Sequence, residues 1–258
     1  MPHFDTEHGR VYYRHWPAPE PHAAVIFLHG FGENTALYHR YAFRLNAAGI
    51  DVWAVDQLGH GLSPGERGNF GTVADSAALA ESLTQLALQT TPDIPLVLQG
   101  HSFGAAVTLS ILFGHPDKYV AAVISGAPLV PIRDLLDTDT NMELDLAALS
   151  ADPFYLDALE NDPLGFADAD GAALARALDT IWDRLGAELP ELDVPTLAVH
   201  GAADAIAPVG AVRAYAEQVD ALELLEIPGG RHDILNETVH HEVAAAIIEF
   251  IGARTGTA

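Results

Sequence analysis

Six short apolar runs, separated by stretches with helical periodicity, constrain the fold of this chain more than any other feature. All but the last run are nearly uninterrupted in apolar character, which is typical of strands buried on both faces of a parallel sheet. The runs cover residues 23–28, 51–56, 96–99, 120–124, 196–199 and 222–227, and helix-like stretches cover 74–89, 102–113 and 239–251. This alternation predicts a doubly wound α/β fold with a mostly parallel central sheet flanked by helices.

Residues 129–195 interrupt the alternation, because no strand pattern appears in them. They carry sixteen acidic residues against three arginines, together with many leucines and aromatic residues. A solvated linker would not contain so much apolar surface, so we expect a small helical insertion that covers the sheet. The predicted organisation is a core of residues 1–128 and 196–258, with an acidic helical cap at 129–195.

The composition excludes several classes of partner and chemistry. Thirty-six acidic residues against twelve basic ones give a formal charge of −24, and such a surface repels nucleic acids and anionic bilayers. The chain has no cysteine, which excludes disulfides, thiolate nucleophiles and thiolate zinc sites. The first ten residues are polar, and no apolar run approaches the ~18 residues of a membrane span. We therefore expect a cytoplasmic protein without stable membrane insertion.

The most specific chemical signal is a pentapeptide between a predicted strand and a predicted helix. Its sequence is Gly100-His101-Ser102-Phe103-Gly104. A Gly-x-Ser-x-Gly sequence in this context forms a sharp, strained turn that presents the serine hydroxyl, and the turn requires small neighbours two positions away. The amino terminus of the following helix also favours negative charge that develops there. These features predict that Ser102 is a nucleophile.

A serine nucleophile needs a histidine base and a carboxylate that orients the base. In this type of fold the chain order is serine, acid, histidine. His232 follows the last predicted strand and Asp204 follows the strand before it, so both are expected at the carboxyl edge of the sheet. Asp233 ranks well below Asp204 as the acid, because a regular backbone directs the Asp233 side chain away from the adjacent His232. His240 and His241 fall in a helical pattern, and we expect both to be solvated.

Acyl transfer also needs two backbone N–H donors directed at the tetrahedral oxyanion. The first apolar run ends in His29-Gly30-Phe31-Gly32, a loop suited to supply one of them. We predict that the N–H groups of Phe31 and Phe103 form this oxyanion hole.

Taken together, these motifs resemble the α/β-hydrolase superfamily and, within it, the monoglyceride lipase and lysophospholipase branch, whose members are similar to serine aminopeptidase S33 hydrolases. The general marks are residues 29–30, 56–63 and 100–104, and the branch marks are residues 32–33, 65–68, 149–153, 162–164 and 232–237. The resemblance covers residues 24–250. It implies cofactor-free hydrolysis of a small-molecule carboxylic ester through Ser102, His232 and Asp204.

The resemblance assigns substrate contacts to Glu33, Leu37, His101 and Leu235. Branch members carry an arginine at the position of Leu37, and some carry a histidine at the position of Leu235. In those members the arginine and the histidine contact glycerol together with the glutamate that matches Glu33. Because only the glutamate is present, we expect esters of simple alcohols to react at least as well as monoglycerides. The chain is also shorter than the branch pattern between residues 126 and 149, which argues against docking on anionic bilayers.

Several alternatives share these motifs. A true monoacylglycerol lipase or lysophospholipase, a perhydrolase and a C–C bond hydrolase would keep the same triad, and a non-catalytic ligand receptor of this fold can keep it too. Enzymes of this fold with an aspartate nucleophile are excluded by Ser102. A metal enzyme is the weakest alternative, because His60, His101 and His232 lack any short-spaced ligand pair. The sequence assigns no oligomeric state.

Overall fold

The computed structural model of the chain describes residues 1–132, 142–143, 145–165, 168–169 and 171–256. Its main sheet has eight strands: β1 (His3–Thr6), β2 (Gly9–Trp16), β3 (Ala23–Leu28), β4 (Ile50–Val55), β5 (Leu96–His101), β6 (Ala121–Ser125), β9 (Thr196–Gly201) and β10 (Leu222–Ile227). Their order across the sheet is β1-β2-β4-β3-β5-β6-β9-β10. The pairs β1–β2 and β2–β4 are antiparallel and all others are parallel. The prediction of a mostly parallel α/β sheet is confirmed.

Burial explains the character of the apolar runs. Strands β3, β4, β5, β6 and β9 are buried along their whole length, because they lie inside the sheet and helices cover both of its faces. Strand β10 is at the edge, and only Leu222 of its residues is buried. This position accounts for the two glutamates that interrupt its sequence.

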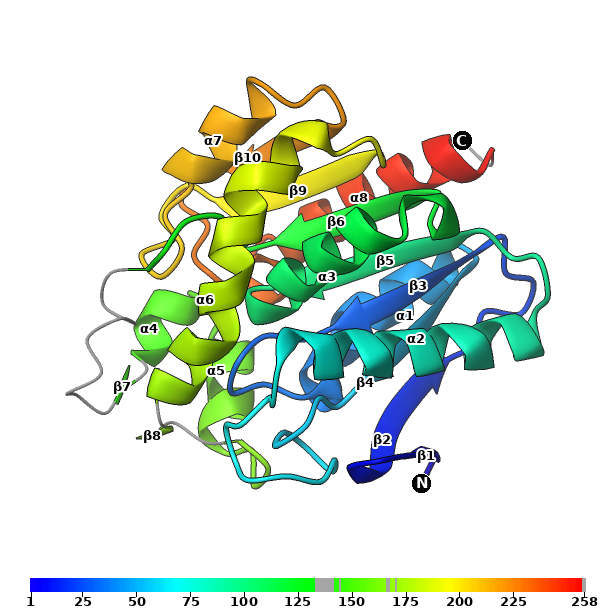
Figure 1. Cartoon of the computed structure of the whole chain (residues 1–258), viewed down its shortest axis with the longest axis horizontal. Helices are drawn as coiled ribbons and strands as arrows, with labels where there is room; N and C mark the ends of the chain where they lie inside the picture. The colour runs from blue at the N-terminus through cyan, green and yellow to red at the C-terminus, as the bar shows by residue number, and fades with distance from the viewer. Residues whose placement is uncertain (133–141, 144, 166–167, 170, 257–258) are drawn as a thin grey trace.

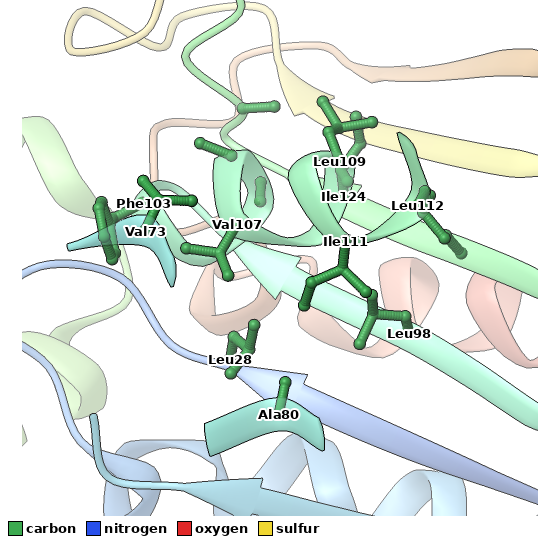
Figure 2. Packing of buried hydrophobic residues seen from close by; sticks show 14 of the residues in the cluster. Leu28, Val73, Ala80, Leu98, Phe103, Val107, Leu109, Ile111, Leu112 and Ile124 are labelled. Carbon is green, nitrogen blue, oxygen red and sulfur yellow. The ribbon is translucent and has the colours of Figure 1, made fainter. Parts of the chain in front are cut away.

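Helices cover the two faces of the sheet in pairs (Figure 1). Helices α1 (His39–Ala47) and α8 (His240–Thr255) pack on one face, and α2 (Val73–Thr90) and α3 (Phe103–Gly114) pack on the other. The apolar side chains of α3 extend almost all round the helix, because it contacts the sheet, α2 and the insertion at once. Figure 2 shows this helix against the central strands, with Ile111 beside Leu98.

The described part of the segment between β6 and β9 is mainly helical, with α4 (Leu146–Leu149), α5 (Pro153–Glu160) and α6 (Gly171–Glu188). Helix α6 packs against α3, and Figure 1 shows all three helices at the end of the sheet toward which β6 leads. The expectation that this segment has no strand is wrong in one detail, because residues 142–143 and 168–169 pair as the two-residue strands β7 and β8. Strands of two residues are too short to show an alternation of apolar and polar residues in the sequence. No helix among the described residues is long and apolar enough to span a membrane.

Hydrogen bonds tie the start of these helices to the loop that follows β10. The Arg231 guanidinium donates to the carbonyl oxygens of Ala147 and Ser150, at 2.7 and 2.8 Å. The Asp233 N–H donates to the carbonyl oxygen of Leu149 at 2.8 Å, and the Glu237 carboxylate accepts from the N–H of the residue after Ser150. The end of α4 and the loop that carries His232 therefore form one connected unit.

Gly104 is required by the approach of α3 to β3, and this generates a stability prediction. An ideal Cβ at Gly104 would lie 2.2 Å from the carbonyl oxygen of Leu28, whereas a Cβ at Gly114, in the last turn of the same helix, meets nothing within 4 Å. We expect Gly104→Ala to lower the free energy of unfolding by about 2 kcal/mol or more, because backbone must move. Gly114→Ala should leave it unchanged or raise it by up to about 1 kcal/mol. Urea titrations of both variants measure the difference; equal stabilities would contradict the packing.

Candidate active site

Ser102 occupies the turn between β5 and α3 with φ of 51° and ψ of −116°, a backbone conformation unfavourable for a side chain. Its N–H donates to the carbonyl oxygen of Ser125 at 2.8 Å, which helps to hold the turn. A Cβ at Gly100 would lie 2.1 Å from the carbonyl oxygen of Gly104. Both glycines of the pentapeptide are therefore needed for the chain to reverse so closely.

The structure brings Ser102, His232 and Asp204 together. The Ser102 hydroxyl lies 2.9 Å from His232 Nε2, and His232 Nδ1 lies 2.9 Å from Asp204 Oδ2. His232 and Asp204 are buried, at 3% and 6% exposure, which shields the hydrogen bond between them from water, whereas Ser102 is partly exposed. The three residues come from the turns and loops that follow β5, β10 and β9, all at the same edge of the sheet.

Asp204 is held as a carboxylate by its surroundings. Burial alone would raise its pKa, but the charge of His232 and hydrogen bonds from His200, His232 and the Ala207 N–H together hold the pKa of Asp204 well below its usual value. His200 Nε2 lies 3.1 Å from Asp204 Oδ2. The sequence analysis missed His200, which is one histidine of thirteen in the chain and belongs to no motif used there.

Phe31 and Phe103, whose N–H groups are predicted to form the oxyanion hole, line the same cavity as Ser102. Their rings pack on Phe70, with ring centroids 5.8 and 3.9 Å away. The Gly30 N–H donates to Glu33 Oε2 at 2.8 Å, which fixes the loop that carries Phe31.

The cavity has a volume of about 270 Å³ and opens beside Ser102. Most of its apolar wall comes from helices α4, α5 and α6 and from the loop after β9, through Leu146, Leu149, Leu159, Leu174, Leu178 and Ile206. Its charged wall includes Glu160 and Asp162 but no arginine or lysine among the described residues. The cavity therefore suits a neutral, mainly apolar ligand.

Glu33 and His101, predicted to contact substrate, also lie on this wall, but their polar atoms are occupied by the protein. Glu33 accepts from the hydroxyls of Tyr38 and Tyr155, at 2.6 and 2.8 Å, in addition to Gly30. His101 Nε2 lies 2.8 Å from Asp233 Oδ1, and its Nδ1 lies 3.1 Å from the Ser125 hydroxyl. The sequence analysis missed Tyr155, since no motif links it to residues more than seventy positions away.

Three sequence expectations do not match the structure. Leu37 packs against the core formed by α1 and α8, and Leu235 is buried within that core, so neither is among the described residues that line the cavity. His240 is buried rather than solvated, because the first turn of α8 packs against the protein, whereas His241 is exposed as expected. As predicted, Asp233 does not contact His232 through its carboxylate; it pairs with His101.

One group of described residues could in principle hold a metal ion. Candidate ligand atoms of His101, His232 and Asp233 lie within 4.8 Å of one another. His232 is engaged by Ser102 and Asp204, and His101 is engaged by Asp233, so a metal would have to replace these hydrogen bonds. His60 is not part of this group; it stacks on Phe70 with ring centroids 4.1 Å apart.

Known proteins provide an independent comparison. The model of the family described as serine aminopeptidase, S33 matches residues 19–239. The chain is 29% identical over 254 residues to the monoacylglycerol lipase of Mycolicibacterium smegmatis, with 88% of each chain covered. The crystal structure of the Paleococcus ferrophilus monoacylglycerol lipase superimposes with a TM-score of 0.82 at 26% identity, covering 95% of this chain and 99% of the other. A thermostable carboxyl esterase from Bacillus coagulans, solved with glycerol, has the same fold, with a TM-score of 0.83 at 21% identity and coverages of 98% and 97%.

The mostly parallel sheet, with a serine on the turn after its central strand, defines the α/β-hydrolase class. Within this class the chain belongs to the serine aminopeptidase S33 family, in its monoacylglycerol lipase branch. Ester hydrolysis by a serine hydrolase is the activity that this membership supports.

The backbone strain at Ser102 generates a second stability prediction. Glycine adopts the observed conformation more easily than alanine, so Ser102→Gly should be about 1 kcal/mol more stable than Ser102→Ala. Ser110, inside α3, provides the matched control, and there the alanine variant should be the more stable one by about 1 kcal/mol. Thermal and urea unfolding of the four variants show, at each position, whether the glycine or the alanine variant is more stable. If the alanine variant were the more stable one at both positions, the backbone at Ser102 would not be strained.

Proposed function

We propose that Ser102, His232 and Asp204 form the catalytic triad and that the N–H groups of Phe31 and Phe103 form the oxyanion hole. The observation that carries this proposal is the continuous hydrogen-bond chain from the Ser102 hydroxyl through His232 to Asp204. Asp204 fixes the imidazole so that Nε2 faces the hydroxyl and can accept its proton.

The reaction has two halves. The Ser102 oxygen attacks the ester carbonyl carbon while His232 Nε2 accepts the hydroxyl proton, and the carbonyl oxygen becomes an oxyanion that the two N–H groups stabilise. The C–O bond to the alcohol then breaks, and the alcohol leaves with the proton from His232. In the second half, water gives its proton to His232 and attacks the acyl-serine, which releases the carboxylic acid and restores Ser102.

We assign the substrate to uncharged carboxylic esters with an acyl chain of modest length. The apolar wall contributed by α4, α5 and α6 fits an acyl chain, and this supports residues 129–195 as a cap over a core of 1–128 and 196–258. Glu160 and Asp162 repel an anionic head group, which disfavours lysophospholipids, and repulsion of the acid product favours its release. The relatives act on monoacylglycerols, so monoglycerides are substrates to test alongside simpler esters.

The triad proposal predicts a specific order of effects. Ser102→Ala should lower kcat on the order of 10⁶-fold and abolish labelling by a fluorophosphonate probe. Asp204→Asn should lower kcat by roughly 10⁴-fold, because the imidazole is left in the wrong tautomer. Asp233→Asn, which removes a neighbouring carboxylate of equal size, should lower kcat at neutral pH far less. The rate of hydrolysis of p-nitrophenyl esters measures kcat for all three variants. A larger loss of kcat in Asp233→Asn than in Asp204→Asn would overturn the assignment of Asp204 as the acid. A wild-type protein that binds esters without hydrolysing them would indicate a receptor.

Head-group selectivity is the second prediction for this site. Both carboxylate oxygens of Glu33 accept hydrogen bonds from protein groups, and Leu37 and Leu235 lie off the cavity wall, so these three residues give no group free to bind glycerol. We expect kcat/KM for an ethyl or p-nitrophenyl ester to be at least comparable to that for the monoglyceride of the same acid. Measurements at matched acyl length, below the aggregation limits, decide this. A preference on the order of a hundredfold for the monoglyceride would show that other residues bind glycerol.

A further inference from the structure

A chain of buried hydrogen bonds lies beneath the proposed triad without taking part in its proton transfers. The Tyr155 hydroxyl lies 2.8 Å from Glu33 Oε1 and 2.6 Å from Asp233 Oδ2. Asp233 Oδ1 lies 2.8 Å from His101 Nε2. Each of these four residues is at most 5% exposed, so their polar atoms depend on one another rather than on bulk water. We call Tyr155, Glu33, Asp233 and His101 the buried network.

Members of the network adjoin each part of the proposed catalytic machinery. His101 directly precedes the nucleophile, Asp233 directly follows the catalytic histidine, and Glu33 accepts from the Gly30 N–H in the oxyanion loop. Tyr155 alone comes from α5, and its hydroxyl is the group that joins Glu33 to Asp233. A shift of this hydroxyl therefore displaces the oxyanion loop and the histidine loop together.

One hydroxyl joins the two carboxylates of the network. The Tyr155 hydroxyl has a single hydrogen, yet it lies within hydrogen-bond distance of both Glu33 and Asp233, at 2.8 and 2.6 Å. Burial and the charges of Asp233 and Glu33 raise the pKa of Tyr155 well above its usual value, so this hydroxyl keeps its proton. The positions of both carboxylates are therefore tied to the Tyr155 hydroxyl.

His101 carries the compensating charge. Burial lowers its pKa, but the hydrogen bond to Asp233 and the charges of Glu33, Asp233 and Asp204 outweigh burial and raise it to about 9. The groups that face His101 are the Ser125 hydroxyl from β6, Asp233 and His232 from the loop after β10, Asp204 from the loop after β9, and Glu33 and His29 from the end of β3 and its loop. As an imidazolium, His101 offsets one negative charge of the two carboxylates that the Tyr155 hydroxyl joins.

We propose that Tyr155 is a positioning residue for the hydrolytic reaction: by hydrogen bonding to both Glu33 and Asp233, its hydroxyl holds the oxyanion loop and the catalytic-histidine loop in register, and the imidazolium of His101 offsets negative charge in this network. The proposal rests on the triad proposed above. It also defines an alkaline limit, because loss of the His101 proton removes the cation that offsets the buried acids near the position where the oxyanion develops.

The test compares Tyr155→Phe with Tyr119→Phe. Tyr119 is the matched control, since its hydroxyl is also buried and bonded, to Thr84 at 3.2 Å, but lies outside the network. We expect Tyr155→Phe to lower kcat for a p-nitrophenyl ester on the order of tenfold with little change in KM, because the misplaced groups act in the transition state. Tyr119→Phe should keep the wild-type kcat, even though both variants lose stability.

Asp233→Asn tests the charge of the network, and does so even if Tyr155→Phe does not fold. In the wild type, kcat should fall as pH rises through about 9. In the variant His101 loses its charged partner, and this alkaline limit should move down by about one pH unit or more. The pKa of His101 is raised in the folded protein, so protonation of His101 stabilises the fold. This stabilisation is complete below pH 6.5, the ordinary pKa of histidine, and is lost as pH rises through about 9. The difference in unfolding free energy between wild type and variant should therefore shrink over that range.

The outcomes separate this proposal from the triad. Equal kcat values for Tyr155→Phe and Tyr119→Phe, or an alkaline limit that Asp233→Asn leaves in place, would overturn the positioning role. A wild type that neither hydrolyses esters nor reacts with a fluorophosphonate would instead overturn the triad, and the positioning role with it. In that case the pH dependence of unfolding would still decide whether His101 carries the charge of the network.

Discussion

The reversal of the chain at Ser102 is the constraint on which the site depends. The serine can project from the end of β5 only because its backbone adopts φ of 51°, and because neither Gly100 nor Gly104 carries a Cβ. The same absence lets α3 start against the backbone of Leu28, one strand away. Two close contacts of backbone with backbone thus place Ser102, the helix amino terminus beneath it and the neighbouring loop after β3.

The strongly acidic character of the chain extends into the site, where each buried carboxylate is balanced individually. Asp204 faces His232 and His200, Asp233 faces His101, and Glu33 accepts three hydrogen bonds. Burial of an acid without such partners would favour its neutral form at a high cost in free energy. Under the proposed function, Glu160 and Asp162 on the cavity wall repel anions, while the acids paired within the protein hold the proposed catalytic groups in place.

The helices between β6 and β9 do more than cover the cavity. Arg231 and Glu237 attach the end of α4 to the loop that carries His232, and Tyr155 of α5 reaches the acids behind the triad. The apolar wall of the cavity and the loop that carries His232, the proposed base, are therefore connected by hydrogen bonds. In the described part of the insertion, helices α4 and α5 are part of the site rather than an independent cover.

Most of the fold could be predicted because it depends on local pattern. Strands buried on both faces must be apolar throughout, so β3 matches its predicted run residue for residue, and Gly-x-Ser-x-Gly between a strand and a helix marks Ser102. Chain order was enough to place Asp204 and His232 at the same edge of a parallel sheet. Leu37 and Leu235 were misplaced, because a match of sequence position does not show in which direction a side chain points.

The partners of Glu33 and His101 could be decided only by the tertiary structure. Tyr155 lies 122 residues from Glu33 and 78 from Asp233 in the chain, and no local pattern connects residues at such separations. The sequence determined which chemical groups stand at the carboxyl edge of the sheet, since strand order and periodicity are local properties. Only the packing of α5 against that edge decided which of these groups form hydrogen bonds with one another, because hydrogen bonds depend on distances of a few ångströms that chain separation does not define.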